Sequence, residues 1–234
     1  MVEDLDLDTY LCISSNELKI YLFNKKNLNN LYFDKIIFNT QKNFIDFNIL
    51  DKFLEENIFK IEKLSKKFIK RIFLIVENIE ITQVNFGIKK KNYESNISEK
   101  LLRNILTEAK DLFRENYQNH QIMHILISRY YENGNYHSSL GDEFSGDYLC
   151  VEFQFKYISK NLVSEINKIL NKYHVELGGC LDGNYIKNYF SSEQLKYSEM
   201  IYKILCGFNE NEVKLVSKNF EKKGFFEKFF QLFS

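Results

Sequence analysis

The sequence contains no proline and no tryptophan, and its 32 basic and 32 acidic side chains cancel each other. Because the formal net charge is zero, no global field draws the protein toward nucleic acid, and we expect no nucleic-acid partner. No run of about 18 apolar residues could cross a bilayer as a helix. The acidic segment Met1–Asp8 also lacks the basic and then apolar pattern of a secretory signal. These absences predict a cytoplasmic protein without a transmembrane helix.

The four cysteines have no paired spacing. Cys12, Cys150, Cys180 and Cys206 each stand among apolar neighbours, where a reduced cysteine packs as a small core residue. We therefore expect free thiols and a reducing compartment.

The apolar pattern predicts an α+β (mixed α/β) fold. The candidate elements in the first part are the β-prone runs Tyr10–Ile13, Leu18–Phe23 and Phe33–Phe38, the helical period of Asn48–Phe68, and the continuous apolar run Ile72–Val76. Ser14–Glu17 has the composition of a hairpin turn between the first two runs. The order β-β-β-α-β indicates a mixed sheet with a crossover helix.

Further elements follow along the chain. The expected strands are one or two within Ile79–Ile88, then Gln121–Tyr131, Tyr148–Tyr157, and a short Val175–Leu177 that ends at Gly178–Gly179. The expected helices begin after Ser98 and Ser159 and occupy Tyr185–Phe190 and Ser192–Cys206, the last closed by Gly207. Asn133–Asn135 is expected to be a turn.

No catalytic constellation is present. The sequence has no P-loop, no Gly-x-Gly-x-x-Gly and no nucleophile elbow. His120 and His124 lie four apart on an expected strand, and no nearby carboxylate or cysteine completes a metal set. Gly141–Glu143 and Leu181–Gly183 have turn composition. We therefore expect no metal, no cofactor and no enzymatic activity.

The order of several segments carries a family resemblance. They are Arg71–Ile79, Asn96–Leu102 with Ala109 and Lys110, His120–Leu126, Tyr148–Tyr157 and Leu162–Leu177. Over about residues 8–185 this order resembles the bacterial cell-division family FtsA, an actin-like family that tethers the FtsZ ring to the inner membrane. The resemblance matches the family's SHS2 insertion, subdomain 1C, and its characteristic histidine to His124.

The resemblance implies a particular domain organisation. Residues 8–78 and 176–208 would form a truncated actin-like 1A subdomain, and residues 79–175 the inserted SHS2-like 1C subdomain. Residues 209–223 would be a linker and residues 224–234 a C-terminal amphipathic helix. Subdomains 2A and 2B of the family have no counterpart, so the family's FtsZ-binding site, which lies in 2B, is not expected here.

The phosphate-binding turn of the family is degenerate in this sequence. In the family an acidic residue precedes Gly-Thr in the first hairpin, whereas here Cys12 replaces the acid, Ser14 the glycine and Glu17 a usual lysine, with Ser15 between them. An ATP site also needs a facing loop from the second half of the fold. The resemblance therefore implies no ATP binding.

The C-terminal segment has the pattern of a membrane-surface helix. Its apolar residues occupy an arc of about 160° on a helical wheel. They are Phe225, Phe226, Phe229, Phe230, Leu232 and Phe233. Lys222, Lys223 and Lys228 favour anionic headgroups. Five buried Phe side chains set a ceiling of about 7–15 kcal/mol, and ordering the segment removes most of it, so one copy binds reversibly. The alternative is docking on the protein's own body or in a partner's groove.

These observations lead to one expected function and one alternative. The resemblance implies a non-catalytic, FtsA-like adaptor of the cell-division machinery on the cytoplasmic side of the bacterial inner membrane, at mid-cell. Its partners would be inner-membrane lipids and division proteins bound through the SHS2-like unit, with self-association strengthening attachment. The alternative is a pilus-assembly platform protein resembling PilM, which has a related actin-like fold.

Overall fold

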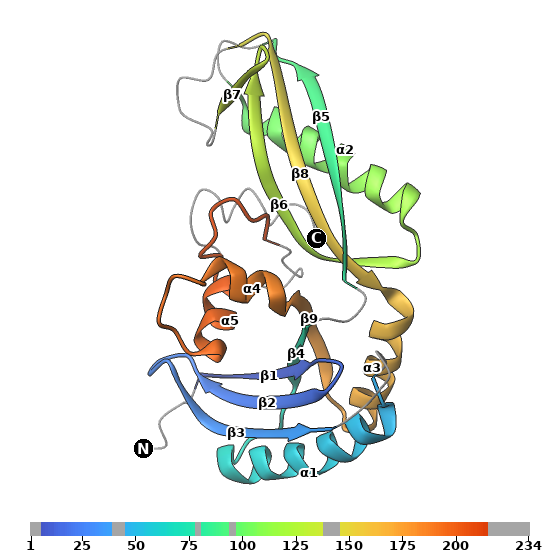
Figure 1. Ribbon diagram of the computed structural model, residues 1–234, viewed down its shortest axis with the longest axis vertical. Helices are drawn as coiled ribbons and strands as arrows, with labels where there is room; N and C mark the ends of the chain where they lie inside the picture. Colours follow the sequence, from blue (N-terminus) through green and yellow to red (C-terminus); the bar gives the residue numbers. More distant parts are fainter. Residues whose placement is uncertain (1–5, 39–44, 78–80, 94–96, 138–145, 215–234) are drawn as a thin grey trace. The chain divides into compact units, whose positions relative to one another are not determined.

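The computed structural model describes residues 6–38, 45–77, 81–93, 97–137 and 146–214 (Figure 1). The chain divides into two compact units. Unit 1 is formed by Met1–Ile81 and Ile158–Phe208, and unit 2 by Thr82–Tyr157 with the described residues from Asn209 onward. Each unit contains one β-sheet with helical cover, so the expected mixed α/β class is confirmed.

Unit 1 is built on a five-stranded sheet with the order β3-β2-β1-β4-β9. Its strands are β1 (Leu7–Ile13), β2 (Glu17–Asn24), β3 (Asn29–Ile37), β4 (Arg71–Val76) and β9 (Glu176–Asp182). β1, β2 and β3 form an antiparallel meander, whereas β4 is parallel to both β1 and β9. The predicted order β-β-β-α-β and its crossover helix are therefore confirmed.

Helices cover both faces of this sheet. They are α1 (Phe47–Ser65), α3 (Lys160–Lys172), α4 (Gly183–Tyr189) and α5 (Tyr197–Leu205). On one face the Tyr32 hydroxyl donates to Asn57 Oδ1 of α1 at 2.7 Å. On the other face the ring of Phe23 lies 5.5 Å from that of Tyr202 of α5. Because the central strands have apolar neighbours on both faces, Tyr10–Ile13 of β1 and Ile72–Val76 of β4 are continuous apolar runs.

Unit 2 is a four-stranded sheet with the order β5-β8-β6-β7 and one helix, α2 (Glu99–Asn116). The strands are β5 (Thr82–Lys91), β6 (His120–Glu132), β7 (Asn135–His137) and β8 (Tyr148–Ser159). Ser98 caps α2 as predicted, because its hydroxyl accepts a hydrogen bond from Leu101 N. The apolar stripe of α2 packs on the sheet through stacked rings of Phe113 and Phe155, 5.3 Å apart.

Several predicted boundaries are wrong, including the end of β9 and the start of the last helix. β9 continues through Gly178–Gly179 to Asp182 instead of ending there, because the extra residue is absorbed as a bulge opposite Ile72 and Phe73 of β4. The last helix begins at Tyr197 and not at Ser192, since the preceding residues form turns. Strand β7 was not predicted; it is a short partner of β6 after the Asn133–Gly134 turn.

The unit boundaries differ from the expected domain boundaries. Helix α3 belongs to unit 1, where the Tyr173 hydroxyl at its end donates to Asp51 Oδ1 of α1 at 2.8 Å. The first residues of the expected linker belong to unit 2, because residues 211–213 pair with β6. Contacts between elements decide both assignments. Local composition does not reveal them, and the composition of residues 209–223 is that of a linker.

The ring cluster around Phe113 predicts how unit 2 responds to mutation. Phe113 is 2% exposed and stacks on Tyr117 and Phe155. Phe113→Ala should lower the free energy of unfolding of unit 2 by about 3–5 kcal/mol, through lost burial and a cavity. Hydrogen–deuterium exchange of α2 and β8 amides measures this change in unit 2 alone. Tyr93→Ala, at an 86% exposed ring, is the control and should cost less than about 0.5 kcal/mol. Equal protection in the two variants would contradict the prediction.

Candidate functional site

Three parallel strands bring their carboxyl ends to one edge of the unit 1 sheet. In the register, Ile13 of β1 lies beside Val76 of β4, and Val76 beside Asp182 of β9. Glu77, which directly follows β4, donates its backbone N–H to Ile13 O at 2.9 Å. Ligands of open α/β sheets bind at this end of the strands. This edge is therefore the place in unit 1 to look for chemistry.

The degenerate phosphate turn lies at this edge and is closed on itself. Ser14 N donates to Glu17 O at 2.9 Å, and the Ser14 hydroxyl donates to the same oxygen at 3.2 Å. The Glu17 carboxylate forms an ion pair with Lys19. Ser15, the remaining residue of the expected motif, is half-buried in the turn. A phosphate would need free backbone N–H donors here. The turn instead presents the Glu17 carboxylate and a Ser14 hydroxyl that is already hydrogen-bonded.

Cys12, which the sequence resemblance aligns with an acidic residue, lies inside the sheet. It is 3% exposed, and burial raises the pKa of its thiol well above the ordinary value, with the charge of Glu77 adding to the effect. A buried neutral thiol does not replace a carboxylate as a cation ligand, and it does not act as a nucleophile. Cys12 is therefore a core residue here.

Glu77 is the centre of the edge. Its side chain is buried, and Oε2 forms an ion pair with Lys187 of α4. The Lys187 ammonium also lies 4.9 Å from the centroid of the Tyr197 ring. Burial is the largest cause that raises the pKa of the Tyr197 phenol far above its ordinary value, and the Glu77 carboxylate adds to it. The edge therefore holds a neutral phenol over a paired carboxylate.

Gly183 allows this close packing. A Cβ at Gly183 would overlap both Glu77 and the Tyr197 hydroxyl. The preceding Asp182 is 1% exposed and accepts hydrogen bonds from Asn184 N at 2.9 Å and Tyr185 N at 3.1 Å. Its carboxylate thus caps α4. Glu77 Oε2 and the Asp182 carboxylate thus have partners inside unit 1, whereas Glu77 Oε1 and the Tyr197 hydroxyl are buried without a hydrogen-bond partner among the described residues.

Sequence reasoning missed this cluster. It assigned Asp182 and Gly183 to turn composition and gave Glu77, Lys187 and Tyr197 no role. Lys187 lies 110 residues from Glu77 along the chain, so no local pattern links them. A usable signal was an acidic residue at the carboxyl end of each buried strand. Glu77 directly follows β4, and Asp182 is the last residue of β9.

In unit 2, a second arrangement surrounds the histidine that the resemblance singled out. His124 is fully buried, with Nδ1 2.5 Å from Glu212 Oε1. Ile127 N donates to Asn211 O at 2.7 Å, and Val213 N donates to Ile125 O at 2.9 Å. Residues 211–213 therefore add a short antiparallel partner to β6, and Val213 enters the unit 2 core.

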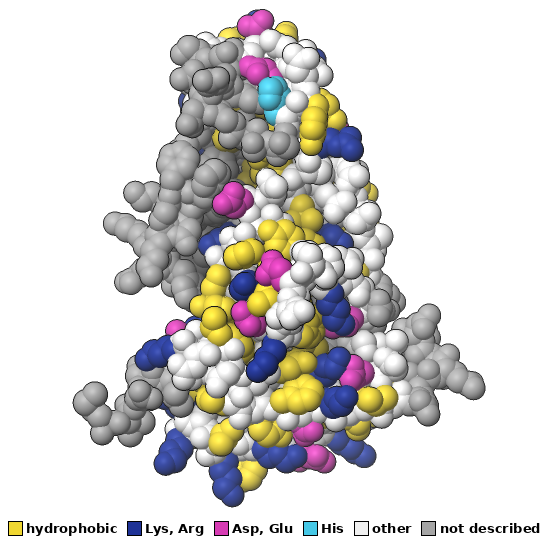
Figure 2. Space-filling view, turned by 60° about the vertical axis from the view of Figure 1, so that its left-hand side comes forward, with side chains coloured by type: hydrophobic (Ala, Val, Ile, Leu, Met, Phe, Trp, Pro, Cys, Tyr) yellow, Lys and Arg dark blue, Asp and Glu magenta, His cyan; other side chains and the backbone are white. Residues whose placement is uncertain are grey.

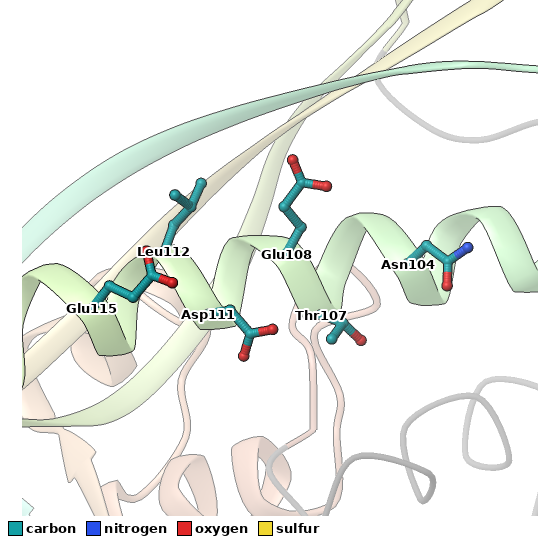
Figure 3. A pocket seen from close by; sticks show the side chains of 6 residues that line it. All are labelled: Asn104, Thr107, Glu108, Asp111, Leu112 and Glu115. Carbon is teal, nitrogen blue, oxygen red and sulfur yellow. The ribbon is translucent and has the colours of Figure 1, made fainter.

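One shallow hollow in unit 2 is formed by the surface of a single helix. Figure 3 shows its lining side chains on successive turns of α2. They are Asn104, Thr107, Glu108, Asp111, Leu112 and Glu115. Ligand sites enclose most of a small molecule's surface, and one face of a single helix does not do so. This hollow supports no site.

The remaining predictions concern metal binding, membrane-spanning helices and the C-terminal segment, and the described residues cover only some of them. Within those residues, no three His, Cys, Asp or Glu side chains are placed to hold a metal ion. No helix in the described part of the chain is long and apolar enough to cross a membrane. The predicted membrane-binding residues all lie outside the described residues: Lys222, Lys223, Phe225, Phe226, Lys228, Phe229, Phe230, Leu232 and Phe233.

No protein-family model and no curated protein matches the sequence.

Similar solved structures include a PilM–PilN type IV pilus biogenesis complex, with 11% identity and a TM-score of 0.47 over 78% of this chain and 49% of that chain. The cytoplasmic domain of EpsL, an inner-membrane component of the type II secretion system of Vibrio cholerae, has 6% identity and a TM-score of 0.40 over 77% and 59%. A Bacteroides thetaiotaomicron protein of unknown function with an actin-like ATPase fold has 15% identity and a TM-score of 0.32 over 83% and 61%. The chain thus spans less than two thirds of each of these three structures, and likeness at this level assigns no function.

Proposed function

We propose that the protein is a non-catalytic adaptor of a membrane-associated assembly, with a shortened actin-like unit 1 and an inserted SHS2-like unit 2. One observation carries the non-catalytic part: the carboxyl edge of the unit 1 sheet is filled by the protein's own side chains. Glu77 is paired with Lys187, and Asp182 caps α4. An adaptor needs surfaces and not an open reaction site.

The charges at this edge also argue against a nucleotide. Glu17, Glu77 and Asp182 place carboxylates around it, and the ammonium of Lys187 is paired with one of them. Phosphate groups bind where free N–H donors and cations converge. We therefore propose that this fold acts through binding alone.

Two assemblies fit such an adaptor. The order of segments that resembles FtsA favours the cell-division machinery on the cytoplasmic face of the inner membrane, with division proteins bound through unit 2. A pilus or secretion platform is the second candidate, because PilM and EpsL are among the similar structures. The TM-scores of both lie below 0.5, so the choice between the two candidates rests on experiment.

The closed edge predicts that the protein does not bind ATP. Isothermal titration of the full chain with magnesium ATP should give no binding heat up to about 1 mM, which is an affinity weaker than about −4 kcal/mol. The physical reason is that Ser14 and Lys187 are already committed to protein partners. A micromolar dissociation constant would overturn the non-catalytic proposal.

The location of the protein in cells separates the two assemblies. A fluorescent fusion should form mid-cell bands, and these should disappear when residues 224–234 are removed or when Phe229→Glu puts a charge on the apolar face of the predicted helix. Gln231→Glu makes a similar change on the polar face and should leave the bands in place. Polar foci would instead support the pilus platform, and bands that persist in Phe229→Glu would refute the lipid-binding helix.

A further inference from the structure

A strongly basic turn follows α1 in unit 1. We define the basic turn as residues 63–70, which contain four lysines and no acidic residue: Lys63, Lys66, Lys67 and Lys70. All four lysine side chains are exposed. In a protein whose total charge is zero, this is a local concentration of positive charge. Figure 2 shows Lys and Arg side chains standing among hydrophobic ones on the face of unit 1 that it draws.

Two large apolar side chains project from the same turn. Phe68 is 84% exposed and Leu64 is 53% exposed, whereas the neighbouring Ile69 is only 8% exposed. A single exposed apolar residue is ordinary. Two of them between four lysines have the composition of surfaces that bind at the membrane interface, where cations meet headgroups and apolar groups enter the acyl boundary.

The conformation of the turn is fixed by hydrogen bonds. Lys66 ends α1 in the left-handed region with φ 55°. The Ser65 hydroxyl accepts from Lys67 N at 3.3 Å and donates to Lys67 O at 3.0 Å. Glu62 Oε1 accepts from Ile69 N at 3.0 Å. These bonds hold Ile69 inward and Phe68 outward, so the exposed ring is preorganised for contact.

Neighbouring acidic groups do not cancel the charge. Glu62 is half-buried and bonded to the backbone of the turn. Glu176 lies beside the turn, since its N–H donates to Lys70 O at 2.9 Å, and it is the register partner of Arg71. Among these described residues, four exposed lysines and Arg71 thus stand beside two carboxylates. The balance is positive around Phe68.

We propose that the basic turn is a lipid-binding site that takes anionic phospholipid headgroups, with Phe68 and Leu64 entering the interface. It deepens the proposed function, on which it rests for the presence of a membrane, but it uses residues unrelated to the terminal helix. The turn lies at the end of α1, and its exposed Phe68 and Leu64 are accessible to a flat bilayer. RNA binding would need a basic groove or aromatic platform able to follow a strand.

Vesicle flotation of the full chain tests this site. The protein should float with vesicles containing about 30% phosphatidylglycerol, more weakly with pure phosphatidylcholine, and less as NaCl rises from about 50 to about 300 mM. Lys66→Gln/Lys67→Gln should lower the partition coefficient roughly 25-fold, at about fivefold for each lysine. Phe68→Ser should lower it on both vesicle types.

Matched variants serve as controls. Lys52→Gln/Lys100→Gln removes two exposed lysines elsewhere, and Tyr93→Ser removes an exposed ring of unit 2; both should bind like the unchanged protein. If the unchanged protein does not float, the proposed membrane attachment fails and the inference fails with it. If it floats and the basic-turn variants match their controls, only the lipid site is refuted. Binding of a single-stranded RNA oligonucleotide that is lost in the same variants would also refute it.

Discussion

The ion pair between the buried Glu77 and the exposed Lys187 is the constraint on which the architecture of unit 1 depends. A carboxylate at the end of a central strand has left water, and it is tolerated only because an ammonium reaches it. That requirement places α4 against the end of β4, and Gly183 is the residue that permits the approach. Tyr197 of α5 lies at the same place, since its hydroxyl and Glu77 both crowd the position of a Cβ on Gly183. One pair thus joins the sheet to two helices from late in the chain.

The same pair closes the edge at which an actin-like fold would hold a phosphate. Glu77 and Asp182 are the groups that could have positioned a cation or a water molecule, and both have internal partners. The degenerate turn adds a bonded serine and a carboxylate. One ion pair thus both joins β4 to α4 and occupies this edge of the sheet. In the proposed adaptor role, binding would fall to the surfaces of the protein, where the charge and exposure of individual turns matter.

Local pattern predicts part of this structure, and tertiary contacts decide the rest. The stripe of α2 and the apolar run of β4 were predictable because periodicity records burial directly. The end of β9 was not, since a glycine pair usually ends a strand and here it forms a bulge. The hairpin turn between β1 and β2 was located correctly, but its closure depends on hydrogen bonds that no spacing encodes. Residues 211–213 look like linker by composition, and only His124 and the core position of Val213 explain their pairing.

Membrane attachment through weak contacts requires more than one of them. A single amphipathic segment binds reversibly, and a few lysines beside one ring bind more weakly still, but linked contacts multiply their partition coefficients. The basic turn belongs to unit 1, whereas the chain that leads to residues 224–234 leaves from the edge of β6 in unit 2. If both contacts bind one bilayer, the second binding step occurs within one molecule, so the two weak contacts together give an affinity that neither reaches alone.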